Sequence, residues 1–240
     1  MTIKMIAVGA HQISVKAIFG FTFMALMAGC SILPEPPVRA DVYDFGPGPL
    51  QAPGPAASAP LPPIALAEVT ATGLPEGSTA LLYRLAYTNA QQLRPYTQAR
   101  WSLPPAVLLH QAVRERLGQR RAVLSGDDGM AVLLERGRMP SVLRLELEEF
   151  SHVFGAPQAS AGLVRVRAVL ADASTAGETL VAQRVFVARR DAATPDAAGG
   201  AKALADAAAQ VAEELAAEAH IVCPYSHALR TATEVAVTVR

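Results

Sequence analysis

Cys30 is the residue whose chemistry the sequence defines most clearly. The run Met27-Ala28-Gly29 precedes it, at the end of an apolar segment that begins at Ala17. Small residues and then a cysteine after a short apolar segment are typical of a lipobox, where the thiol is joined to lipid and the preceding segment is cleaved. Leucine is most common where this chain has Met27, which is also apolar and unbranched. We therefore predict a lipidated Cys30 and a cleaved lipoprotein signal peptide over residues 1–29.

The segment before Cys30 has the other features of an export signal. Lys4 and Lys16 supply positive charge, and the apolar run is about a dozen residues, shorter than the roughly 20 that span a bilayer as a helix. The alternative is an ordinary cleaved signal peptide that ends near a cysteine. Ser31 follows the cysteine, where an aspartate would indicate inner-membrane retention. These features predict a lipid-anchored protein on the periplasmic face of the outer membrane.

Histidine and cysteine residues near the C-terminus are candidate metal ligands. His220, Cys223 and His227 have ligand-like spacing, but no fourth ligand is evident, so a helix-end histidine and a packed cysteine are favoured over zinc. His110 and His152 are isolated and are expected to be structural or exposed. The sequence therefore predicts no metal and no cofactor.

The sequence offers little support for catalysis by a carboxylate pair or by a nucleophile. The chain has no Gly-x-Ser-x-Gly and no phosphate-binding loop. Asp127-Asp128 lies between glycines and is typical of a turn, and Glu148-Glu149 lies in a predicted strand, where neighbouring side chains point to opposite faces. Basic and acidic residues balance at 21 each, which excludes an electrostatic case for nucleic-acid binding. We predict no catalytic residues and no enzyme.

Residues 30–63 are predicted to be a tether. Ten of the 18 prolines fall here, and proline interrupts both helices and sheets. At about 3.1 Å per residue, such a linker reaches about 100 Å when extended. Its one aromatic patch, Tyr43 to Gly46, is a candidate for pinning the linker to the domain.

Residues 64–240 are predicted to form an α+β domain, in which two main helices pack on one face of a mixed or antiparallel sheet. Glu146 and Glu148 alternate with leucines in one strand, and Arg165 and Arg167 alternate with apolar residues in the next, so opposite charges favour their antiparallel pairing. The phase of the first strand slips at Glu149-Phe150, which predicts a bulge. Strands are predicted at Ile64–Thr70, Leu81–Tyr87, Tyr96–Trp101, Ala122–Leu124, Ser141–Phe154, Leu163–Leu170, Thr179–Arg189 and, at an edge, Thr233–Val239.

Two amphipathic helices complete the predicted domain. The first is expected to begin at Ser102 as N-cap, with Pro104 and Pro105 in its first turn, and to end at Gly118. The second is expected over Ala201–His220, after a loose loop at Thr194–Gly200. The predicted buried stripes are Ala106, Leu109, Val113 and Leu117 in the first helix, and Leu204, Ala208, Val211, Leu215 and Ala219 in the second.

The run from Tyr96 to Pro105 joins aromatic, basic and diproline elements just before the first helix. The lone Trp101 is favoured as a buried anchor of the strand-to-helix turn, and a surface for docking a partner is the alternative. Taken as a motif that is either structural or partner-docking, the candidate residues are Tyr83, Arg84, Tyr96, Arg100, Trp101, Pro104 and Pro105.

This motif, with Leu82 to Tyr87 before it and Leu108-Leu109 after it, resembles the ABC-type transport auxiliary lipoprotein family, as does Tyr43 to Pro47. The resemblance covers most of Cys30 to Val222. It implies a periplasm-facing lipoprotein that accompanies an ABC permease, its ATPase and an MCE-domain protein in lipid transport between membranes. It carries over no catalytic residue.

Three functions therefore remain for the structure to weigh. The first is an accessory subunit that is held by its lipid anchor and docks on a protein partner of the transport system. The second is a carrier whose sheet and helices enclose a phospholipid chain. The third is a secreted hydrolase, which the lack of a triad motif disfavours.

Overall fold

One long strand, β7 (Ser141–Ala156), organises the sheet. Along one edge it pairs antiparallel with β8 over most of its length. Along the other edge it pairs in parallel with β2, β3 and β4 in succession, through Ile64 with Ser141, Thr70 with Glu146, and Tyr83 with His152. The mixed sheet is therefore built on both edges of one strand.

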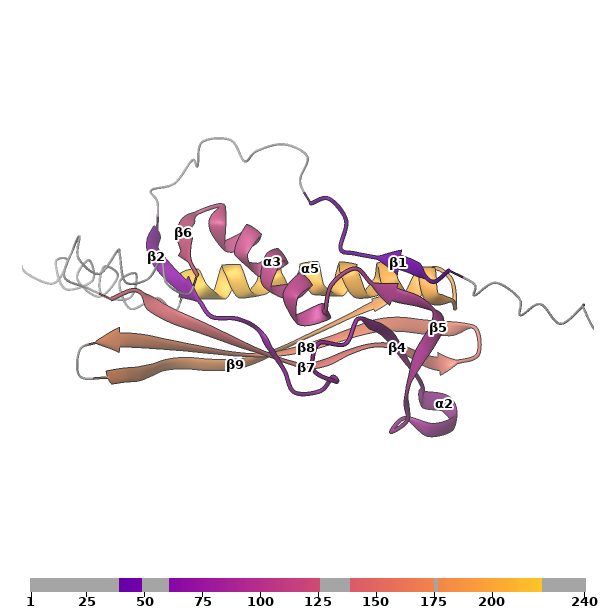
Figure 1. Cartoon of the computed structure of the whole chain (residues 1–240). Helices are drawn as coiled ribbons and strands as arrows, with labels where there is room; N and C mark the ends of the chain where they lie inside the picture. The colour runs from indigo at the N-terminus through magenta and orange to yellow at the C-terminus, as the bar shows by residue number, and fades with distance from the viewer. Residues whose placement is uncertain (1–38, 49–60, 126–138, 175–176, 222–240) are drawn as a thin grey trace, which may run out of the picture. The chain divides into compact units, whose positions relative to one another are not determined.

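A computed structural model describes residues 39–48, 61–125, 139–174 and 177–221, and a compact unit begins at Ala40. Among these residues nine strands form one sheet (Figure 1). In chain order the elements are β1 (Asp41–Tyr43), β2 (Leu61–Leu66), β3 (Thr70–Ala71), β4 (Ala80–Leu85), α2 (Ala86–Asn89), β5 (Leu93–Trp101), α3 (Pro105–Gly118), β6 (Arg121–Leu124), β7 (Ser141–Ala156), β8 (Ala159–Ser174), β9 (Gly177–Asp191) and α5 (Ala197–Ile221).

The α+β prediction is confirmed, with two main helices on one face of a mixed sheet. Helix α5 lies along β8 and β9, and α3 packs beside α5 on the same side (Figure 1). Both predicted apolar stripes contribute to the core between the helices and the sheet, although Ala106 is only partly buried. The meander of β7, β8 and β9 and the hairpin of β4 and β5 also match the predicted order.

The predicted bulge in β7 lies at Glu148. The register shifts between Leu147 and Glu149, so that Glu149 takes the position opposite Arg165. Because one extra residue is inserted, Phe150 points into the core although Glu148 points away from it. The local loss of alternation in the sequence was a correct signal for this bulge.

Two helix starts were predicted wrongly. Pro104, rather than Ser102, is the N-cap of α3, and the helix has no side-chain cap hydrogen bond. The Ser102 N–H is instead the donor to the carbonyl oxygen of Tyr43, at 2.7 Å, so Ser102 belongs to the strand end. Helix α5 begins at Ala197 and so includes most of the predicted loose loop. The Asp196 carboxylate accepts the Gly199 N–H at 2.8 Å, which caps this first turn despite the two glycines.

The folded unit also extends into the stretch expected as a tether. β1 lies wholly within it, and β2 begins at Leu61 instead of Ile64. Asp41 to Tyr43 contain no proline, so they are free to pair. Pro62 and Pro63 fall where the register of β2 against β6 shifts, which is where a strand tolerates residues without an N–H.

Candidate functional site

Trp101 is the centre of an aromatic cluster at the end of β5. Its indole is buried, with ring centroids 5.6 Å from Phe45 and 5.4 Å from Phe150, both edge to face. Phe45 also stacks on Phe150 at 6.0 Å, so the cluster joins the segment after β1 to β7. The structure therefore favours the interpretation of Trp101 as a buried anchor. Helix α3 begins at Pro105, four residues after Trp101, with Pro104 as its N-cap.

Arg84 ties β4 to the bulge of β7. Its Nε and Nη2 donate to the two carboxylate oxygens of Glu149 at 3.1 and 3.0 Å, and its Nη1 donates to the carbonyl oxygens of Ala90 and Gln91. Ser151 adds a hydrogen bond to Glu149 at 2.6 Å. The forked guanidinium thus joins two strands and a turn, a geometry that lysine does not reproduce.

Tyr96 belongs to a second cluster, with Tyr83, Phe154 and His152. The Tyr83 and Tyr96 ring centroids lie 4.6 Å apart, and the Tyr96 hydroxyl lies 2.9 Å from Nδ1 of His152. His152 is fully buried, and a Cβ on Gly200 of α5 would collide with its imidazole. This cluster fixes the first turn of α5 against the sheet.

Burial dominates the electrostatics of this second cluster. It lowers the pKa of His152 to about 4, against a smaller opposing effect of Asp196, and it raises the pKa of Tyr96. Within the described residues, Nε2 of His152 and Nε1 of Trp101 have no hydrogen-bond partner. The imidazole of His152 is fully buried and neutral, and its Nδ1 lies against the Tyr96 hydroxyl, so the pair is suited to packing.

Sequence reasoning did not identify His152 as part of this cluster. The available signal was the period of two after the bulge, because Phe150, His152 and Phe154 then share the inward face of β7. A polar residue between two buried phenylalanines predicts a buried side chain with a nearby hydrogen-bonding partner.

Arg100 is the one residue of the predicted motif with a free, exposed head group. It lies opposite Val42 of β1 and makes no hydrogen bond or ion pair within the residues that the structure describes. Cys30, Cys223 and His227 lie outside those residues, as does Asp127-Asp128, and the side chain of His220 is not described. No group of three or more possible metal ligands occurs in the described part of the chain.

The face of β7, β8 and β9 away from α5 carries a ladder of charges. Arg167 contacts Glu146 and Glu148 at 3.6 and 2.6 Å, as the predicted pairing of the two strands requires. Arg165 approaches Glu148 at 3.9 Å. The carboxylates are thus matched by arginines on the neighbouring strand.

Exposed apolar side chains adjoin these charges on β9. Val185 lies opposite Arg167 and Val187 lies opposite Arg165, and the two valines are 39% and 50% exposed. Phe186 and Ala188, between and beside them, are buried beneath α5. We call Val185, Val187, Arg165 and Arg167 the open face. An apolar stripe next to paired charges has the composition of a protein-docking surface.

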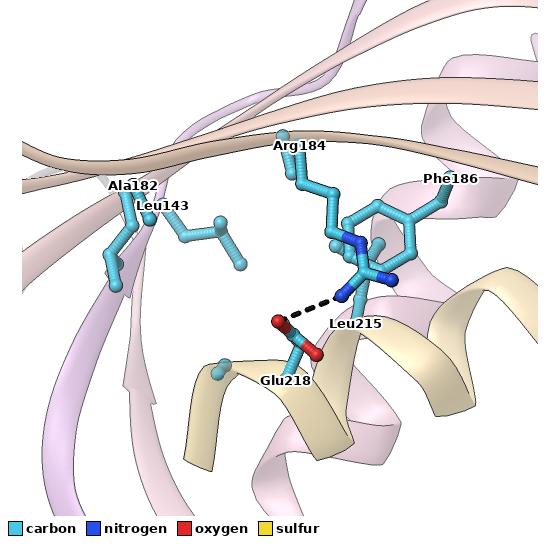
Figure 2. A pocket seen from close by; sticks show the side chains of 9 residues that line it. Leu143, Ala182, Arg184, Phe186, Leu215 and Glu218 are labelled. Atoms are coloured by element: carbon cyan, nitrogen blue, oxygen red, sulfur yellow. Dashed lines mark ion pairs between the residues drawn. The ribbon is translucent and has the colours of Figure 1, made fainter. Parts of the chain in front are cut away.

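One pocket lies between the C-terminal half of α5 and the sheet. Figure 2 shows Arg184 of β9 reaching toward Glu218 of α5, with an ion pair of 2.8 Å. The volume is ≈ 40 Å³, room for a few water molecules at most. The lining residues are Leu143, Ala168, Leu170, Ala182, Arg184, Phe186, Leu215, Glu218 and Ala219. This pocket is too small for an acyl chain.

Comparison with known proteins adds a family and a fold. The family model described as "ABC-type transport auxiliary lipoprotein component" matches residues 43–216. A crystallised protein from Xanthomonas campestris is similar over 78% of this chain and 99% of its own, with a TM-score of 0.60 and 20% identity. An uncharacterised protein of known structure is similar over 75% and 98%, with a TM-score of 0.51 and 14% identity. No curated protein matches. In the described residues, no helix is long and apolar enough to cross a membrane.

Proposed function

Because this chain belongs to the ABC-type transport auxiliary lipoprotein family, we propose that it is the accessory lipoprotein of an MCE-type lipid transport system and acts by docking on a protein partner. Cys30 carries the lipid that holds it at the outer membrane, and the domain faces the periplasm. Its partners are the MCE-domain protein and, through it, the ABC permease and ATPase. The family is one of transport components and not of enzymes.

The open face is the observation that supports docking. Helices α3 and α5 cover one side of the sheet, which leaves Val185 and Val187 in solvent beside Arg165 and Arg167. Two exposed apolar side chains beside arginines are suited to burial against a protein partner. We propose that this partner is the MCE-domain protein.

The carrier alternative is less well supported. A lipid carrier needs an enclosed apolar space for at least one acyl chain, and binding sites for small molecules are typically about 300–1,000 Å³. The pocket beside α5 offers ≈ 40 Å³, and its lining includes the Arg184–Glu218 ion pair. The volume supports docking over carriage.

The test is co-purification with the MCE protein after mild crosslinking, in a strain that also expresses the permease. We expect the wild-type chain to recover the MCE protein and Val187→Glu to lose most of it, since a charge on the open face opposes burial. The matched control is Val107→Glu, because Val107 is 41% exposed on α3 and Val187 is 50% exposed. Equal recovery by the two variants, or a wild-type chain that purifies alone at native expression, would overturn the proposal.

A further inference from the structure

The stretch rich in proline is divided by β1. Asp41, Val42 and Tyr43 pair in parallel with Ala99, Arg100 and Trp101 of β5. The Tyr43 carbonyl oxygen accepts the Ser102 N–H, and Phe45 packs on Trp101 and Phe150. A strand held by backbone pairing and by two aromatic contacts is part of the domain, so it ends the tether.

This division shortens the reach of any anchor at Cys30. Only residues 31–40 lie between the cysteine and β1, which allows about 31 Å when extended, against the about 100 Å of an undivided linker. The prolines after β1 belong to a connection whose two ends, β1 and β2, are both in the sheet. Such a closed connection adds nothing to the distance between lipid and domain.

Exposed apolar residues gather where the tether enters the domain. Val42 is 53% exposed beside Arg100, and Leu103 and Val107, at 40% and 41%, follow on the segment joined to Tyr43. Three of the seven large hydrophobic residues exposed in the described chain thus lie at this corner, which we define as Val42, Leu103 and Val107.

The charges around the corner do not favour an anionic partner. Arg100 is exposed there, but so are Asp41 and Asp44, so the corner has no net positive charge. An apolar corner without net positive charge is suited to the interfacial region of a lipid layer, where burial of apolar side chains supplies the attraction.

We propose that this corner rests on the lipid surface that holds the anchor, so that the domain stands on the membrane by its β1 end. The inference depends on the proposed anchor at Cys30. It places Thr179, near the other end of β9, far from the lipid. Arg190 pairs with Gly162, which lies beside the end of β4, and the 11 residues of strand from Arg190 to Thr179 span about 36 Å. The open face is left free along the sheet for a protein partner.

The experiment uses the lipidated full-length chain in phosphatidylcholine vesicles that contain a headgroup quencher. A fluorophore is placed at Leu103→Cys or at Thr179→Cys, each with Cys223→Ser so that one thiol is labelled. We expect strong quenching at position 103 and little at position 179. Equal quenching at the two positions would overturn the inference.

Two equal insertions test the role of β1. Twelve Gly and Ser residues placed after Pro37 lengthen the tether and should reduce quenching at position 103 to the level at position 179. The same insert placed after Gly54 lies beyond β1 and should leave the quenching unchanged. Equal effects of the two inserts would show that β1 does not end the tether and would overturn the inference.

The docking variants separate this inference from the proposed function. Val107→Glu should lower the quenching at position 103 and leave the recovery of the MCE protein unchanged. Val187→Glu should leave the quenching unchanged and lower the recovery of the MCE protein. Flotation of the vesicles reports the anchor itself: a chain that fails to float, or a Cys30→Ser variant that floats equally well, overturns both proposals. If the chain floats with the vesicles but is quenched equally at positions 103 and 179, only the proposed orientation of the domain is overturned.

Discussion

At the scale of single residues, His152 makes stability depend on pH. Its imidazole is neutral because burial lowers its pKa to about 4 from the ordinary 6.5. Between these two values the unfolded chain binds a proton that the folded chain does not, so stability is lost as the pH falls. The slope reaches about 1.4 kcal/mol per pH unit, and the loss totals on the order of 3 kcal/mol.

The measurement is urea denaturation at pH 7 and pH 4.5 for wild type, His152→Leu and His110→Gln. We expect His152→Leu to lower stability at pH 7 but to have the shallower dependence on pH. His110 is partly exposed on α3, so His110→Gln should keep the wild-type slope. Parallel slopes for wild type and His152→Leu would contradict this account.

The sequence predicted some of these residues better than others. Trp101 was expected to be buried because a lone tryptophan usually buries much of its area. The Arg84–Glu149 pair was not expected, because the two residues are 65 positions apart and meet only when β4 pairs with β7. Local pattern predicts which face a side chain takes, whereas its partner depends on strand order.

At the scale of elements, the close approach of α5 to the sheet depends on glycines. A Cβ on Gly162 of β8 would lie 2.5 Å from the backbone of Ala203 and Leu204, which has little freedom to move. Gly155 of β7 has no such neighbour within 4 Å. We expect Gly162→Ala to lower the free energy of unfolding by about 2–3 kcal/mol and Gly155→Ala to change it little, as measured by urea denaturation. Equal effects of the two substitutions would show that α5 does not pack closely against β8 at Gly162.

Two other glycines, Gly199 and Gly200, explain why the start of α5 was missed. Gly199-Gly200 is typical of a loop, since glycine is unfavourable inside helices. In the structure Gly200 lies against His152, where any side chain would collide, so tertiary packing overrides the local preference. The period of 3.6 residues correctly predicted the rest of α5 and nearly all of α3, because there the apolar stripe decides the packing.

At the scale of the whole molecule, the tight interior predicts that the protein carries no lipid. Organic extraction of the purified, detergent-exchanged chain should yield less than one phospholipid per protein by mass spectrometry, apart from the acyl groups of the proposed anchor at Cys30. The pocket of ≈ 40 Å³ is the physical reason. One phospholipid per chain, retained through detergent exchange, would revive the carrier alternative.

The entry of β1 into the sheet was not predicted from the sequence. Proline content distinguishes residues 30–63 from the rest of the chain. A composition taken over the whole stretch does not reveal the three residues of β1, which contain no proline and pair with β5. The aromatic patch at Tyr43 to Gly46 did indicate a contact with the domain, and Phe45 makes it. Its partners Trp101 and Phe150 are distant in sequence, so the pairing of β1 with β5 was not predicted.

From the position of β7 we expect the parallel part of the sheet to close late in folding. Its parallel partners β2, β3 and β4 are synthesised before it, and Ile64 and Ser141 are 77 residues apart. Closing such long loops is slow, whereas β7, β8 and β9 pair with sequence neighbours. Before β7 and α5 emerge, Leu66, Leu81 and Trp101 lack the central strand and the long helix that complete the core around them. The N-terminal third of the domain is therefore the part of a nascent chain that most needs a chaperone.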